Sequence, residues 1–581
     1  MWKCSAAAKA GRSVLQLEKE GEYGGLWASL TLDEFRKVVT QGSPTHGSLY
    51  GGKIYEVGSS EELGPPRGYS LDISPHVIHG VGPLIKMLLG SGAHNYTEYK
   101  LIKTTIIRDP RTGKAQSVPC SRAEIFRDQN LSPLQKRTLM RFLKTYISTA
   151  LTQTAQTSDT SPSRFTCSGD VSFISLLNEI EGMDETLQRC ILHGVLLQPE
   201  LEQEGDAVVT CQTAARLIRM YTNSLGRYGI DAGPFLVPMH GFGELPQAFC
   251  RTAAVHGAVQ VLRCGVERYE YDGSAQMHRV ILNNETKQEL KSRFVAASHQ
   301  FRSTMMSGGS RIFLDAGRER CKEVGGSQLR KKAIHRCIAI VTGPTQLTPE
   351  AQALLILPSP LHAMKDKSGF KTIWGLQLGP GNGVTPSSTW LLHLWCESHY
   401  GDVGTAEQAL LPCINTLVDF EPRPSSPSPY SLAVASTDAN ATLNKALPRA
   451  LWVAFFSLPI DSTSISLNTP APKGFVFCPG PTAEVGCVET TDIAKRLYFE
   501  MLYGPDSEVS TKYSNPAVDD EQVTEDEFPL SPEFVGNKNA EGEDRTIDSG
   551  DTGMEELTQE LAALHNALGL DSSEGGTSAL S

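Results

Sequence analysis

The sequence lacks the motifs by which several large enzyme classes are recognised. No G-x-x-x-x-G-K-[ST] loop occurs in its 581 residues, so nothing marks the chain as a GTPase or an ATPase. The G-x-S-x-G turn that carries the nucleophile of many hydrolases is also missing. A third absence is the G-x-G-x-x-G turn that binds a dinucleotide pyrophosphate. These absences predict a protein with no covalent catalysis and no bound cofactor.

Targeting and disulfide signals are scarce as well. The 13 cysteines are spread along the chain without a C-x-x-C pair, which favours buried free thiols over a disulfide framework. The chain has no apolar run of about 20 residues and no charged-apolar signal at its start. We therefore expect a soluble protein of the cytosol, where thiols stay reduced.

One segment, TWLLHLWCESH, contains residue types that bind metals. Its alternating pattern predicts a β-strand that places His393 and His399 on the face opposite Cys396. Because the ligands of a metal ion must surround one point, we expect no metal site here.

The net charge of −12 is unevenly distributed along the chain. Residues 501–581 contain 19 Asp and Glu against 3 Lys and Arg, which leaves residues 1–500 at +4. No clustered basic face is evident, so we expect no nucleic-acid partner. The acidic tail is predicted to be disordered, except for a Leu-rich helix over 554–570 that would form mainly on a partner.

The first residues predict the end of a helix, MWKCSAAAKA, followed by a short buried strand, Gly11–Glu18. In a dinucleotide-binding fold, an acid at the end of this strand meets the ribose, and a strand with a glycine turn precedes it. That strand and turn are missing here, which predicts a sheet short of one central strand. We interpret Glu18 as a solvated acid rather than a ligand.

The apolar pattern over residues from about 120 to 235 predicts helices. Ser132–Gln135 fits a capping box with proline at the first helical position, and an amphipathic pattern follows it. A polar segment over 153–164 predicts a flexible insertion. The apolar positions of the four expected helices are Leu134, Met140, Phe142, Leu143 and Ile147, then Phe173, Ile174, Leu176 and Leu177, then Leu187, Ile191, Val195 and Leu196, and last Leu217, Met220, Tyr221 and Leu225.

Beyond Ala258 the pattern becomes β-like, with short strands rich in β-branched residues and broken by Gly, Asp and Asn. The glycine cluster over 378–384 predicts a hairpin loop, and the Ser-Pro run over 422–431 predicts a surface loop. A helix over 490–502 closes the fold.

The most informative stretch is Pro238–Ala258, PMHGFGELPQAFCRTAAVHGA. It follows an apolar strand, turns on two glycines and opens a helix at Leu245-Pro246, where proline is tolerated in the first turn. Glu244 and Arg251 are seven residues apart, so they share one helix face with about 10 Å between them along the axis. This separation is too long for two groups acting on one bond and suits a rigid, bipolar docking surface.

These segments resemble the signatures of the Rab GDP-dissociation inhibitor and Rab escort protein superfamily. GFGELPQAFCR, with SLGRYG and PFLVPMHG before it, resembles one signature block. EYGGLWASL, YSLDISPHVIHGVGPLIKMLL and TEYKLI resemble further blocks in the family's order. The escort branch is favoured by the long insertions, the acidic tail, Trp27, and the segments VPCSRAEIF, PRALWVAFF and VFCPGP.

The resemblance implies an α/β (α+β) fold. A large flavoprotein-like domain would span 1–118 and 236–502, with a small helical domain inserted at 119–235 and the acidic tail at 503–581. The same resemblance places a strand and a glycine turn before the first residues. This sequence lacks both, so the resemblance implies an N-terminal truncation of roughly 20 residues.

In function, the resemblance implies a non-catalytic escort, the accessory component A of Rab geranylgeranyltransferase. Such a protein binds GDP-bound Rab GTPases and presents them to the α/β heterodimer of the type II transferase. It then shelters the geranylgeranyl lipid and delivers the Rab to membranes, with which it associates transiently.

Motif matching assigns Rab binding to Tyr23, Glu244 and Arg251. In this family the transferase contacts an aromatic residue and an arginine of the helical domain. Phe173 and Arg189 are the counterparts that we predict, although a core phenylalanine and a solvated arginine would explain them too.

Two alternatives remain open. A Rab GDP-dissociation inhibitor that recycles prenylated Rabs is the nearest, since it shares the Rab-binding motifs. A flavin-dependent oxidoreductase would also use Glu18 and the pair Gly24-Gly25, but the missing glycine turn leaves nothing to bind the pyrophosphate.

Overall fold

The computed structural model describes residues 1–41, 49–110, 112–119, 122–152, 171–199, 209–229, 232–284, 286–298, 301, 332–358, 372–398, 405–420, 447–460, 472–505 and 507. The chain divides into a unit from Met1 to Asp526 and a second from Glu527 to Ser581, and every described residue belongs to the first. Four sequence predictions lie outside the described residues: the insertion at 153–164, the position of His399, the loop at 422–431 and the helix at 554–570.

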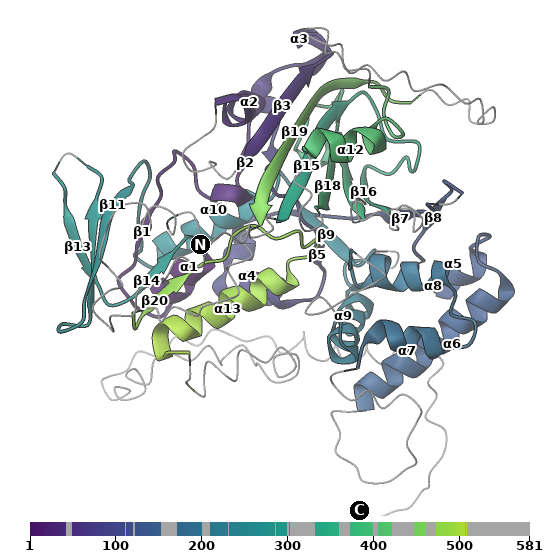
Figure 1. Ribbon diagram of the computed structural model, residues 1–581, viewed down its shortest axis with the longest axis horizontal. Coiled ribbons are helices and arrows are strands. Elements are labelled where there is room, and N and C mark those ends of the chain that lie inside the picture. The colour runs from purple at the N-terminus through teal and green to yellow at the C-terminus, as the bar shows by residue number, and fades with distance from the viewer. Residues whose placement is uncertain are drawn as a thin grey trace, which may run out of the picture. The chain divides into compact units, whose positions relative to one another are not determined.

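The first unit is built around an eight-stranded sheet with the order β3-β19-β15-β18-β17-β16-β7-β8 (Figure 1). Neighbouring strands are antiparallel, except for the parallel pair β16 and β7. The α/β class predicted from the sequence is confirmed. The strands are β3 (Tyr50–Glu56), β7 (Thr104–Arg108), β8 (Ala115–Ser117), β15 (Lys332–Val341), β16 (Gln352–Leu357), β17 (Ile373–Leu378), β18 (Trp390–Glu397) and β19 (Ala450–Ile460).

Both faces of this sheet are buried, which explains why its central strands read as nearly continuous apolar runs. On one face, Phe35 of α2 (Leu32–Gln41) packs edge-on against Trp452 and Phe456. The other face is covered by α12 (Ala406–Ile414), which begins with a capping box.

The predicted alternation along β18 is confirmed for its described residues. His393 lies between Leu391 and Trp395, which belong to one core, whereas Cys396 belongs to the core on the other face. The glycine cluster over 378–384 connects β17 to the adjacent antiparallel β18, as predicted. Among the described residues, no group of three or more His, Cys, Asp or Glu side chains could hold a metal ion.

Short strands form five smaller sheets in the described part of the chain. Two are parallel pairs, β1 with β10 and β14 with β20, and the strand predicted to end at Glu18 is β1. The others are antiparallel: β2 with β4, β5-β9-β6, and the three-stranded β11-β12-β13. Their bounds are β1 (Leu15–Leu17), β2 (Ser29–Leu30), β4 (Leu71–Asp72), β5 (Ile78–His79), β6 (Tyr99–Leu101), β9 (Phe235–Pro238), β10 (Val259–Val261), β11 (Val266–Asp272), β12 (Met277–Leu282), β13 (Glu289–Ser292), β14 (Val295–Ala297) and β20 (Phe475–Phe477).

Four helices pack around a further core that includes Trp2, Leu84, Phe249 and Tyr498. The first residues form a helix, as predicted, and the helix expected over 490–502 begins two residues earlier and ends one residue later. These helices are α1 (Trp2–Lys9), α4 (Pro83–Ser91), α10 (Glu244–Val255) and α13 (Val488–Tyr503). The short helix α3 (Ser60–Leu63) lies near the end of β3.

The helices predicted between residues 120 and 235 form a separate group with its own core (Figure 1). They are α5 (Arg122–Arg127), α6 (Pro133–Thr152), α7 (Phe173–Glu179), α8 (Glu185–Arg189), the π-helical turn Cys190–Val195, and α9 (Cys211–Ser224). No helix among the described residues is both long and apolar enough to cross a bilayer.

The start of α6 confirms one prediction and corrects another. The Ser132 N–H donates to Gln135 Oε1 at 2.7 Å and the Gln135 N–H donates to Ser132 Oγ at 3.3 Å, which makes the predicted capping box. Leu134, however, is 63% exposed and takes no part in the buried face. At 100° per residue, Leu134 lies about 90° from the middle of the buried stripe of Thr138, Leu139 and Phe142.

Candidate functional site

The segment Pro238–Ala258 folds as predicted, from strand β9 through a glycine turn into α10, which begins at Glu244, one residue earlier than expected. Gly241 has φ of +93°, a left-handed conformation that favours glycine. A Cβ atom there would lie 2.6 Å from Ser29 Oγ and 2.7 Å from Asp72 Oδ1. The turn is therefore pressed against two other segments and has no space for a side chain.

A buried carboxylate connects these segments. Ser29 faces Asp72 in the short β2–β4 ladder, and the Ser29 hydroxyl donates to Asp72 Oδ1. Asp72 Oδ1 also accepts from the Phe242 N–H at 2.9 Å, and Ser29 Oγ accepts from the Gly243 N–H at 2.7 Å. We call these four residues, Ser29, Asp72, Phe242 and Gly243, the clasp. It holds the EYGGLWASL segment against the start of α10.

Burial dominates the electrostatics of the clasp. It raises the pKa of Asp72 to about 6, against the opposing effects of the Ser29 and Phe242 hydrogen bonds and of the positive charge of Arg336. Arg336 of β15 is itself buried, with its guanidinium carbon 5.4 Å from the centre of the Trp395 ring. Burial lowers the pKa of Arg336 to about 9, which still leaves it charged at neutral pH.

Tyr23 lies between the end of β1 and α10. Burial raises the pKa of its hydroxyl, with smaller contributions from the charges of Cys250 and Glu18, so the hydroxyl remains a donor at neutral pH. The next residue, Gly24, has φ of +114°, and a Cβ there would lie 3.3 Å from Pro246 Cγ. The predicted site residue Tyr23 is thus brought close to the helix that carries the other two.

Glu244 and Arg251 occupy the first turn and the middle of α10. The Arg251 side chain is exposed, and its guanidinium carbon lies 4.5 Å from the centre of the Tyr96 ring, which restricts its position. Glu244 is half-buried, and burial raises its pKa against the opposing charge of His240. The helix therefore presents an acid and a base at fixed places.

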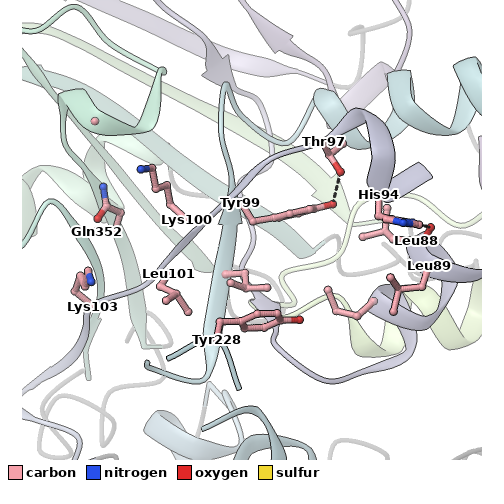
Figure 2. Close-up of a pocket in the computed structure, with 13 residues that line it drawn as sticks. Leu88, Leu89, His94, Thr97, Tyr99, Lys100, Leu101, Lys103, Tyr228 and Gln352 are labelled. Atoms are coloured by element: carbon pink, nitrogen blue, oxygen red, sulfur yellow. Dashed lines mark hydrogen bonds between the residues drawn. The ribbon is translucent and has the colours of Figure 1, made fainter. Parts of the chain in front are cut away.

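A pocket of about 620 Å³ adjoins this region (Figure 2). Its wall is mainly apolar and includes Leu88, Leu101 and Leu236, whereas Lys100 and Lys103 supply positive charge. Figure 2 shows the two lysines and Gln352 at one end, and His94, Leu88 and Leu89 at the other. Such a lining suits an apolar segment or chain that carries an acceptor or a negative charge near one end.

Tyr99 links this pocket to α10. It lies opposite Pro238 in the β6–β9 ladder, and its hydroxyl accepts from Thr97 Oγ1 at 2.9 Å. Burial raises the pKa of Tyr99 to about 12, and the charge of Glu244 adds to this effect. The pocket and the start of α10 are therefore neighbours.

The two residues predicted to contact a transferase are both buried in the helical group. Phe173 is fully buried in the core of the helical group, and Arg189 is 3% exposed and paired with Glu185 one turn earlier. A buried ring cannot contact a partner unless the helices separate. The burial of Phe173 is what a core phenylalanine would show, whereas the burial of Arg189 differs from that of a solvated arginine.

Three residues of the site were not predicted from the sequence: Asp72, Ser29 and Tyr96. Asp72 did leave a signal, because an acid within an apolar run such as YSLDISPHVI must find hydrogen-bond partners when the run is buried. Ser29 and Tyr96 left no such signal, since their partners lie in distant segments.

The chain matches the family model described as "GDP dissociation inhibitor" over residues 5–369. It is 26% identical to "Rab escort protein 1" of Arabidopsis thaliana over 90% of this chain and 93% of that protein. "Rab proteins geranylgeranyltransferase component A 1" of Homo sapiens is 24% identical over 80% of this chain, and the match spans 61% of that longer relative. "Rab GDP dissociation inhibitor beta" of Canis lupus familiaris is 27% identical over 44% of this chain and 52% of its own length.

Among solved structures, a Rab GDI of Plasmodium falciparum is similar, with a TM-score of 0.58 and 15% identity. The match covers 87% of this chain and 95% of that one. At this identity the likeness shows a shared fold.

Proposed function

Because the chain belongs to the GDP dissociation inhibitor family, we propose that it is an escort for Rab GTPases. It binds GDP-loaded Rabs, presents them to the type II geranylgeranyltransferase α/β heterodimer for C-terminal prenylation, and delivers them to membranes. Its role is that of a non-catalytic accessory subunit in the cytosol, without a cofactor of its own.

The observation that carries the proposal is the docking of the EYGGLWASL segment, which contains Tyr23, against the start of α10. The two segments are separate family signatures, and the bond between Ser29 and Gly243 that joins them spans 214 residues of sequence. With Glu244 and Arg251, Tyr23 forms what we call the Rab-binding platform. Tyr23 supplies a ring and a donor, Arg251 a forked donor and Glu244 an acceptor, which suits a polar protein surface. The buried clasp behind them makes the platform rigid.

The helical group supplies the lipid shelter. A prenyl chain of twenty carbons needs an apolar enclosure, because each buried methylene is worth about 0.8 kcal/mol. Helices of this group can separate more readily than strands of a hydrogen-bonded sheet. We assign this role to a domain over 119–235 and Rab binding to a domain over 1–118 and 236–502, with the acidic tail at 503–581 as a third part of the chain.

The pocket beside Tyr99 fits the extended segment of a Rab between its globular body and its lipid. It is mainly apolar, it borders the first turn of α10, and its lysines offer donors to a peptide backbone. When a Rab is bound to the platform, the extended segment that follows its globular body would be the first part of the Rab to reach this pocket.

An escort is favoured over an inhibitor because the relative named as an escort matches 90% of this chain, while the dissociation inhibitor matches 44%. The experiment that separates them is prenylation of an unmodified Rab by purified transferase, with and without this protein. An escort raises the rate, whereas an inhibitor only extracts prenylated Rab from membranes. A flavin spectrum in the purified protein would instead favour the oxidoreductase alternative.

A further inference from the structure

We propose that Asp72 is a positioning residue of the Rab-binding platform, and that its buried carboxylate sets the placement of the Tyr23 segment relative to α10. The inference rests on the proposed function, since it takes Tyr23, Glu244 and Arg251 as the groups that contact a Rab. Asp72 itself is 2% exposed and acts through its neighbours.

The start of α10 depends on acceptors from other segments. Its N-cap residue is Gly243, which has no side chain to cap the helix, and no side-chain cap bond is made there. The first N–H groups of a helix need acceptors from elsewhere. The Glu244 and Leu245 N–H groups donate to the carbonyls of Gly241 and Phe242, at 3.3 Å and 3.1 Å. Ser29 accepts from the N–H of the N-cap residue Gly243, and Asp72 accepts from Phe242, the residue before it, which brings a negative charge to the end of the helix where the dipole favours one.

The hydrogen bonds of the clasp have a fixed direction. The Ser29 hydroxyl has a single hydrogen, and it donates that hydrogen to Asp72. This leaves a lone pair of Ser29 Oγ to accept from the Gly243 N–H at 2.7 Å. Asp72 therefore orients the one hydroxyl that connects the two segments directly.

The clasp has little free space around it. A Cβ on Gly243 would lie 2.6 Å from the Ser29 backbone nitrogen, and the Trp27 and Phe242 rings pack edge-on with centres 6.2 Å apart. In such close packing, a change in the clasp is passed on to both segments rather than absorbed by a void. Tyr23 precedes Ser29 in the first segment, and Glu244 directly follows Gly243 in the second.

The test compares Asp72→Asn with Asp72→Leu in the full chain, by titration with a GDP-loaded Rab. Asparagine keeps an acceptor for Ser29 and Phe242, so its affinity should stay within about threefold of the wild type. Leucine removes both bonds and leaves the Phe242 N–H unsatisfied, so its affinity should fall about tenfold. Equal affinities of the leucine variant and the wild type overturn the inference.

A matched control separates positioning from general loss of stability. Thr405→Ala removes the capping box of α12 on the far face of the large sheet and destabilises the fold away from the clasp. It should not alter Rab affinity. Should Asp72→Leu fail to fold, Ser29→Ala tests the same link, with a threefold to tenfold loss expected.

A double-mutant cycle of Asp72 and Tyr23 measures the coupling between these two residues in Rab binding. A purely structural role of Asp72 would give no such coupling. If Asp72 acts by placing Tyr23, then the Asp72→Leu substitution should lower Rab affinity less in the Tyr23→Ala variant than in the wild type. Full additivity contradicts the inference. If the wild type binds no Rab at all, both the inference and the proposed function fail. If the wild type binds Rab and the Asp72 variants bind it equally well, only the inference fails.

Discussion

Arg216 of α9 and Asp492 of α13 form a paired contact, with 2.6 Å from Nη1 to Oδ2 and 3.2 Å from Nη2 to Oδ1. Both side chains are largely buried. α9 belongs to the helical group, while α13 packs on the core around Trp2 and Tyr498. Val488, at the start of α13, also joins the core of the helical group. The pair therefore fastens this group to the body that carries the platform.

Replacing Asp492 with alanine should destabilise this connection. Removing one partner of a buried charge-assisted pair costs about 1–3 kcal/mol. We expect lower protection of the α9 amides in hydrogen exchange, with β15 and β19 unchanged. Asp33→Ala is the control, because Asp33 makes an exposed pair with Arg36, and such pairs contribute little. Equal protection of α9 in the Asp492 variant and the wild type would show that the pair does not stabilise this connection.

Reversing the charge of Arg251 should weaken Rab binding at least about tenfold, a loss of about 1.4 kcal/mol in binding free energy. The residue is exposed, so the melting temperature should change little. The measurement is a Rab titration of Arg251→Glu beside Lys291→Glu, which makes the same change on the exposed strand β13. Similar affinities for the two variants would remove Arg251 from the platform.

Replacing Gly243 with alanine should reduce both stability and Rab affinity. Its φ of −59° is open to alanine, so the cost is steric and comes from the new Cβ at 2.6 Å from the Ser29 nitrogen. Overpacking of this kind typically costs about 1–3 kcal/mol. Gly273→Ala is the matched control, since its Cβ would meet no atom within 4 Å. Denaturant unfolding of both variants decides the point, and equal midpoints would contradict the clasp geometry.

Glu484 should make stability fall as the pH rises. It is half-buried beside the start of α13, where it accepts from the Glu489 N–H at 2.8 Å and the Thr490 N–H at 3.0 Å. Burial raises its pKa from 4.5 to about 7, so the folded protein holds the proton more tightly than the unfolded chain does. The stabilisation is complete below about pH 4.5 and is lost as the pH passes through about 7.

The measurement is the free energy of unfolding of the wild type minus that of Glu484→Gln, taken from pH 4 to pH 8. The difference should decline with rising pH, by an amount on the order of 3 kcal/mol. A flat or rising difference would mean that Glu484 is not the group responsible.

Features that depend on neighbours in sequence were predicted well. The Ser132 capping box, the alternation of His393 and Cys396 in β18, and the glycine turn into α10 all follow from contacts within a few residues. The shared face of Glu244 and Arg251 follows from helix geometry alone. Leu134 was misplaced because the position of the buried stripe on α6 is set by the helices that pack against it.

Features that depend on distant segments were decided by the tertiary structure alone. Asp72 finds its partners in Ser29 and Phe242, 43 and 170 residues away, and no local pattern names them. The burial of Phe173 and Arg189 likewise follows from how the helices pack. The sequence by itself determined the family signatures and the local elements, because helix and strand periodicity act over a few residues. Only the fold decided which of these residues meet and which face solvent, because burial and hydrogen-bond partners are set by chain segments far apart in sequence.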